Sequence, residues 1–122
     1  MQSRGIRVAI TLSANTKEEI KCATVELLNE MLSKNEIKTQ DISFAIFTLT
    51  SDLNADFPAK YARLECGFNQ VPMMCYQELD VENSLRMCLR ILLNVNTNKS
   101  QEEIKHVYLR GATILRGDLK NE

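Results

Sequence analysis

Two arginines lie within segments of strand periodicity, on the face opposite to their apolar sequence neighbours, and their side chains are the ones best suited to chemistry. Arg7 lies in the segment 5–12, and Arg90 lies in the segment 85–95. A guanidinium on a strand face belongs either to an ion pair at a surface or subunit contact, or to an anion-binding pocket. Its planar fork can hold a carboxylate through two parallel hydrogen bonds. Because two separate strands each carry one such arginine, we favour a pocket that binds a small anion.

Three further polar residues are candidates, although none of them indicates a site alone. Cys75 and Glu78 lie in a segment that leads from a strand into a loop, and Tyr108 lies near the end of the chain. A lone cysteine or tyrosine is most often part of a core, and a lone glutamate most often faces solvent. Tyr108 alternates with Val107 and Leu109, so its phenol is expected on the side opposite to theirs.

The elements that position these side chains follow from hydrophobic spacing. Ile6, Val8 and Ile10 alternate as in a half-buried strand. Thr16 and Glu19 have the spacing of a capping box, and the apolar stripe behind them predicts a helix. We expect strands at 5–12, 42–50 (buried on both faces), 71–75, 85–95 and 107–115, a helix at about 17–33, and a short helix from Pro58 to Gly67. This order predicts an α+β fold, with a mixed sheet packed against two helices.

Composition limits the classes of function. The chain has 122 residues and a formal net charge of −1, which predicts a single domain over residues 1–122 without the basic excess typical of nucleic-acid binding. No apolar run is long enough to span a bilayer, and we expect no membrane partner and a cytoplasmic location. With one histidine and four cysteines that lack metal-site spacing, we expect no metal, no cofactor and free thiols.

Several short motifs occur together in a fixed order: Arg4-Gly5-Ile6-Arg7, Phe57-Pro58-Ala59-Lys60 with Arg63, Val71-Pro72 through Cys75, Gln77-Glu78, Asp80-Val81, Cys88 with Arg90, His106-Val107-Tyr108-Leu109 and Leu115-Arg116. Through them, residues 4–119 resemble the AroH-class chorismate mutases. That resemblance implies the cofactor-free conversion of chorismate to prephenate. It also implies a homotrimer that forms a pseudo-α/β-barrel, with active sites in clefts between neighbouring subunits.

The resemblance further implies which residues form the site. The central ones would be Arg7, Cys75, Glu78, Arg90 and Tyr108. The adjoining subunit's wall would comprise Phe57, Ala59, Lys60 and Arg63, with Met73 and Met74 lining the cleft. Leu115 and Arg116 would belong to a closing tail that is flexible at about residues 116–122. The chain departs from the family pattern at Val8 and Ile10, where Gly and Thr are usual, and at Gly117, where Pro is usual.

The reaction suggests a role for each central residue. It is an intramolecular rearrangement of a dicarboxylate, so it needs fixed cations and an ordered substrate rather than a proton donor. On this hypothesis Arg90 donates to the ether oxygen of the breaking bond. Arg7, helped by Tyr108, holds the carboxylate of the enolpyruvyl arm. Glu78 accepts from the ring hydroxyl, and Cys75 is its polar neighbour.

Two other functions fit the same pattern of residues. One is an imine or enamine deaminase on a similar trimeric fold, which would need a positioned water. The other is a non-catalytic trimeric module that binds a small carboxylate. The first would hydrolyse an imine, and the second would be stabilised by chorismate or prephenate without turnover.

Overall fold

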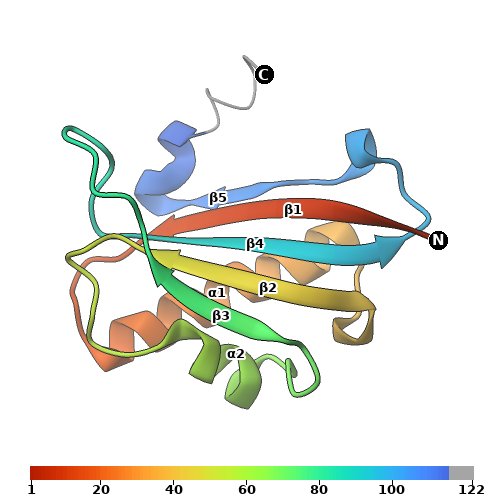
Figure 1. Cartoon of the computed structure of the whole chain (residues 1–122), viewed down its shortest axis with the longest axis horizontal. Helices are drawn as coiled ribbons and strands as arrows, with labels where there is room; N and C mark the ends of the chain where they lie inside the picture. The colour runs from red at the N-terminus through yellow and green to blue at the C-terminus, as the bar shows by residue number, and fades with distance from the viewer. Residues whose placement is uncertain (116–122) are drawn as a thin grey trace.

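The computed structural model describes residues 1–115 of the chain. They form a five-stranded mixed sheet in the order β3-β2-β4-β1-β5, with both α-helices on one face (Figure 1). The strands are β1 (Gln2–Thr11), β2 (Ile42–Leu49), β3 (Met73–Gln77), β4 (Cys88–Thr97) and β5 (Val107–Leu109). The helices are α1 (Lys17–Asn35) and α2 (Pro58–Glu65), and 3-10 helices span Thr39–Asp41, Gln101–Glu103 and Arg110–Leu115. The predicted α+β class, with a mixed sheet and two helices, is confirmed.

Local sequence determines where both helices begin and end. Thr16 caps α1, accepting a hydrogen bond from the backbone N–H of Glu19 at 3.1 Å. The helix ends where Glu36 takes a left-handed conformation with φ 54°, two residues beyond the predicted end. Pro58 is the first residue of α2, where its missing N–H costs nothing. The helix α2 ends at Glu65, two residues before the predicted end at Gly67, which has φ 78°.

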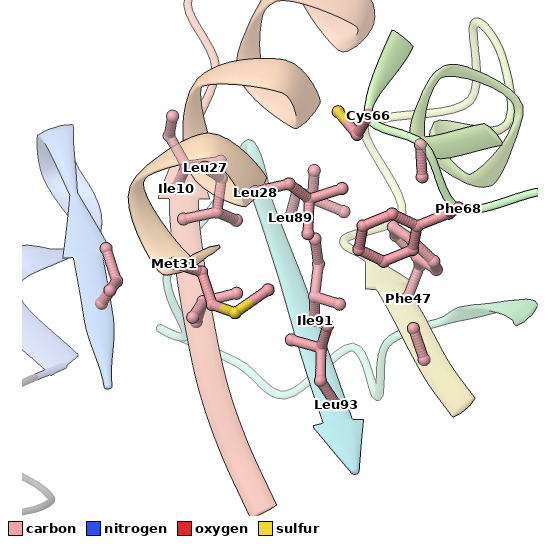
Figure 2. Packing of buried hydrophobic residues seen from close by; sticks show 14 of the residues in the cluster. Ile10, Leu27, Leu28, Met31, Phe47, Cys66, Phe68, Leu89, Ile91 and Leu93 are labelled. Atoms are coloured by element: carbon pink, nitrogen blue, oxygen red, sulfur yellow. The ribbon is translucent and has the colours of Figure 1, made fainter. Parts of the chain in front are cut away.

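The core lies between the helices and one face of the sheet. Figure 2 shows Leu27, Leu28 and Met31 of α1 close to Ile10, Leu89, Ile91 and Leu93 of the sheet, with Phe47, Cys66 and Phe68 beside them. Full burial of each large apolar side chain contributes roughly 1.5–3 kcal/mol before entropy losses. Val8 and Ile10, which depart from the family pattern, point into this core and are fully buried. They therefore lie on the face opposite to Arg7.

On the sheet face opposite the two α-helices, β2 is less buried than predicted. Ala45 and Phe47 are buried on the core face, but Phe44, Ile46 and Thr48 on the other face are exposed or half-buried. The prediction that both faces of β2 are buried is therefore wrong for the single chain. The reason is that both helices cover the same side of the sheet (Figure 1).

Several predicted strand boundaries also differ from the structure; β1, for example, begins at Gln2, three residues before the predicted start. Three of the differences have a backbone reason. Pro72 has no N–H to donate to the strand ladder, and β3 begins only after it, at Met73. Met87 has φ 52° and interrupts the extended backbone before β4 begins. Arg110 has φ 54° and ends β5, so that residues 110–115 form a 3-10 helix instead of a strand. No helix within residues 1–115 is long and apolar enough to cross a membrane.

Candidate active site

The sheet face opposite the two α-helices gathers polar residues from neighbouring strands into one row. In the register of the sheet, Ala9 pairs with both Arg90 and Tyr108, and Thr48 pairs with Arg90. Paired residues project from the same face of a sheet. Tyr108, Arg90 and Thr48 therefore share this face with Arg7, which lies two residues before Ala9.

Arg90 and Glu78 form a half-buried ion pair at one end of this row. Arg90 Nε lies 3.1 Å from Glu78 Oε2, but this buried N–H makes no hydrogen bond with any described residue. The two charged groups therefore attract each other, although this N–H is not aligned to form a hydrogen bond with the carboxylate. Thr48 Oγ1 donates to the other carboxylate oxygen, Glu78 Oε1, at 2.7 Å. The backbone N–H of Glu78 donates to Leu49 at 2.8 Å, which fixes the residue just beyond β3.

Arg7 and Tyr108 meet at the other end. Arg7 Nε donates to the Tyr108 hydroxyl at 3.1 Å. The backbone N–H of Arg7 donates to His106 Nδ1 at 3.0 Å. Tyr108 is buried in a small cluster with Ala9 and other residues that is separate from the main core, so its phenol has the predicted orientation.

A hollow of about 310 Å³ lies on this face; its lining consists of Arg7, Ile46, Thr48, Arg90, Ile91 and Leu92. Two guanidinium groups border it, and the remaining lining is mainly apolar. This combination can hold an anionic group by its charge and an unsaturated ring by apolar contact. From the sequence, His106 is recognised only as part of a motif and Thr48 is not singled out, because the contacts of both residues depend on pairing between distant strands.

A second hollow of about 360 Å³ is lined by the four residues predicted for the adjoining subunit's wall, Phe57, Ala59, Lys60 and Arg63, together with Met73, Met74 and Cys75. It lies where α2 meets β3, and none of its lining residues borders the first hollow. The structure thus divides the predicted site residues of one chain into two groups. Cys75 belongs with the second group, away from Arg90, and burial raises the pKa of its thiol.

The predicted closing tail is described only at its beginning. Leu115 packs against the cluster that contains Tyr108, which places it next to the Arg7 end of the row. Arg116, Gly117 and the rest of segment 116–122 lie outside the described residues.

The fold and the site define an α+β protein with two guanidinium groups around one hollow and a carboxylate beside Arg90, a combination of charges suited to a small anion. Comparison with known proteins is more specific, because the model of the family "Chorismate mutase type I" matches residues 3–119. The chain belongs to this family.

Individual relatives match this chain over nearly its whole length. The chain is 41% identical over 119 residues to chorismate mutase AroH of Bacillus subtilis (strain 168), covering 98% of this chain and 94% of that protein. It is 44% identical over 119 residues to chorismate mutase AroH of Thermus thermophilus, covering 97% of each. The solved chorismate mutase from Clostridium thermocellum superimposes with a TM-score of 0.88 and is 48% identical, over 91% of this chain and 98% of that one.

Proposed function

We propose that this chorismate mutase rearranges chorismate to prephenate at the hollow between Arg7 and Arg90, as a step of aromatic amino acid biosynthesis. The observation that supports this most strongly is the placement of both guanidinium groups around one hollow, with Glu78 beside Arg90. Chorismate carries two carboxylates, so fixed cations are needed to bind it. We also propose a cytoplasmic location, since all four cysteines are free thiols, as is typical of a reducing compartment.

The reaction breaks a C–O bond and forms a C–C bond within one molecule, with no external proton or electron. Catalysis then rests on holding the folded conformer and on stabilising the charge that develops at the ether oxygen. Arg90 suits the second task, because its Nε–H is buried and makes no hydrogen bond with the described residues. A donor already desolvated and in position loses little energy in reorganisation when the oxygen becomes negative.

The other residues of the row bind and orient the substrate. Arg7, supported by the Tyr108 hydroxyl, would hold the enolpyruvyl carboxylate. Glu78 would accept from the ring hydroxyl and face the positive charge that develops on the ring. Cys75 would reach the same substrate from a neighbouring chain as a neutral thiol, because burial raises its pKa.

We propose that the two hollows meet between neighbouring chains of a homotrimer. The sheet face opposite the two α-helices carries apolar side chains that a monomer leaves accessible, including Met74 at 57% and Leu92 at 46% exposure. Contiguous apolar surface of this kind favours association with another protein surface. Placing the second hollow of one chain against the first hollow of its neighbour would bring Lys60 and Arg63 to the Arg90 site.

The direct test follows the loss of chorismate ultraviolet absorbance with purified protein and with the variants Arg90→Ala and Arg90→Lys. Removing one preorganised donor commonly lowers kcat by about 100- to 1000-fold, so Arg90→Ala should lower kcat much more than it raises KM. Lysine should also perform poorly, because a point charge cannot reproduce the fork. Arg86→Ala is the matched control, since Arg86 is exposed and pairs only with Asp80 among the described residues. A kcat near wild type for Arg90→Ala would refute the proposal, and stabilisation by chorismate without turnover would indicate a sensor.

Sharing of the site between chains is tested by complementation. Arg90→Ala and Arg63→Ala chains are unfolded, mixed in equal amounts and refolded together. After random assembly, roughly a quarter of the sites would contain both an intact Arg90 from one chain and an intact Arg63 from its neighbour. Activity should therefore rise well above that of either refolded parent. A mixture no more active than its parents would contradict the shared site.

A further inference from the structure

Thr48 lies where its hydroxyl can determine how the two opposite charges of the site, on Arg90 and Glu78, pair with each other. It lies on β2, opposite Arg90 of β4 and Tyr76 of β3, and it lines the hollow. Its hydroxyl has one proton, which it donates to Glu78 Oε1 at 2.7 Å. As a β-branched residue in a central strand, threonine holds this hydroxyl with little rotational freedom.

The need for such a bond follows from the geometry of Glu78 and Arg90. Glu78 lies beyond the end of β3, and its backbone is fixed by the 2.8 Å bond to Leu49, but its side chain has three rotatable bonds. A carboxylate beside a guanidinium normally turns to form two parallel hydrogen bonds. Here Arg90 Nε is 3.1 Å from Oε2 without hydrogen-bond alignment. Thr48 holds the opposite oxygen of the same carboxylate.

We propose that Thr48 is a positioning residue that prevents Glu78 from closing onto Arg90. By holding Oε1, the threonine hydroxyl keeps the carboxylate near Arg90 yet out of its hydrogen-bonding fork. The Nε–H then remains directed at the ligand, and Glu78 keeps a free lone pair for a ligand hydroxyl. This inference rests on the proposed roles of Arg90 and Glu78. Without the threonine hydroxyl, the two charges would pair with each other instead of with the substrate.

The experiment is a double-mutant cycle between Thr48→Val and Glu78→Gln, with chorismate turnover as the readout. Valine keeps the shape of threonine but removes the donor. Thr48→Val should lower kcat/KM by about tenfold, in line with the loss of one hydrogen bond to a charged group. Thr48→Ser should stay within about twofold of wild type, because it keeps the hydroxyl. In the Glu78→Gln background, Thr48→Val should have almost no further effect, because a neutral amide is not drawn into the fork of Arg90.

The control is Thr97→Val, which removes another half-buried threonine hydroxyl from a strand, at the end of β4 and outside the hollow. It should leave turnover unchanged, and melting temperatures of all variants are measured alongside. If Thr48→Val does not fold, Thr48→Ala takes its place in the cycle.

Three results would each overturn the inference. Wild-type turnover in Thr48→Val would show that the hydroxyl is not needed. An equal loss in the Glu78→Gln background would show that Thr48 acts independently of Glu78. Full activity of Glu78→Gln alone would instead remove the role proposed for Glu78, and with it the basis of the inference. The first two results leave the proposed function intact, so the two failures are distinguishable.

Discussion

Replacing Arg110 by glycine is expected to destabilise the protein less than replacing it by alanine, which reverses the usual order of these two residues. Arg110 ends β5 in a left-handed conformation with φ 54°. A residue with a Cβ is strained there by roughly 1–2 kcal/mol, whereas glycine is not. Alanine keeps this strain. Glycine removes it but loses roughly 0.5–1 kcal/mol through the greater freedom of its unfolded chain.

Both variants also lose the contacts of the arginine side chain. Arg110 Nη1 lies 3.2 Å from the carbonyl oxygen of Thr11 and 3.2 Å from Glu19 Oε1, and Nη2 lies 2.9 Å from Glu26 Oε1. The side chain is 33% exposed, so solvent screens both ion pairs. Two screened pairs and one hydrogen bond to a carbonyl together contribute about 2 kcal/mol. Alanine should therefore lower the free energy of unfolding by about 2 kcal/mol, and glycine by about 1 kcal/mol.

Urea unfolding at one fixed protein concentration measures these differences, since association would make stability depend on concentration. High salt should narrow the gap between wild type and alanine, because ion pairs are screened. It should leave the gap between glycine and alanine unchanged, because backbone strain is not electrostatic. Arg86 serves as the control, since its φ is not positive and glycine there should be no better than alanine. A glycine variant at Arg110 less stable than the alanine variant would refute the reasoning.

Two further predictions concern titrating groups. A hydrogen bond from the Tyr61 hydroxyl, with a second from the backbone of Phe57, holds the pKa of Asp56 at about 2. Because this pKa lies below the unfolded value, the stabilisation is present above about pH 4 and is lost as pH falls towards 2. The variant Asp56→Asn should therefore show a weaker dependence of the urea unfolding midpoint on pH between about 4 and 2. The same pH dependence in the variant and the wild type would contradict this prediction. Burial raises the pKa of Cys66 to about 11, so about one thiol in a thousand is ionised at pH 8. Iodoacetamide should then label exposed Cys22 and leave Cys66 unmodified until urea is added, as mass spectrometry of the peptides would show.

Strand periodicity was sufficient to place the two arginines on the correct face. Side chains alternate along a strand, so Arg7 and Arg90 had to point away from the buried neighbours on either side of them. Which residue lies opposite which could not be predicted, because pairing joins segments far apart in the sequence. The contact between Thr48 and Glu78 depends on that pairing, and so does the position of Arg90 between Ala9 and Thr48.

The end of β5 shows where periodicity fails. Val107 to Leu115 is apolar enough to predict a continuous strand, yet the strand stops at Leu109. Beyond it the backbone turns at Arg110, whose side chain reaches Glu19 and Glu26 on α1. Ala112 is buried after this turn, while Ile114 is 72% exposed. Such a turn depends on tertiary contacts with a helix more than eighty residues earlier, which no local pattern reports.

Charge balance gives a physical reason to expect that one chain alone cannot turn over chorismate. In the first hollow, Arg7 and Arg90 supply two positive charges and Glu78 one negative charge, so the sum is one positive charge. A dicarboxylate bound there would leave one negative charge uncompensated in a partly desolvated site, which is unfavourable. Lys60 and Arg63 of the second hollow carry two positive charges, but Asp56 lies 3.3 Å from Lys60, so a facing chain would add one net positive charge. The sum would then be two positive charges, which would balance the two carboxylates of the bound dianion. A variant made monomeric by charged substitutions on the exposed apolar face should therefore fold yet lose turnover, and a fully active monomer would contradict this argument.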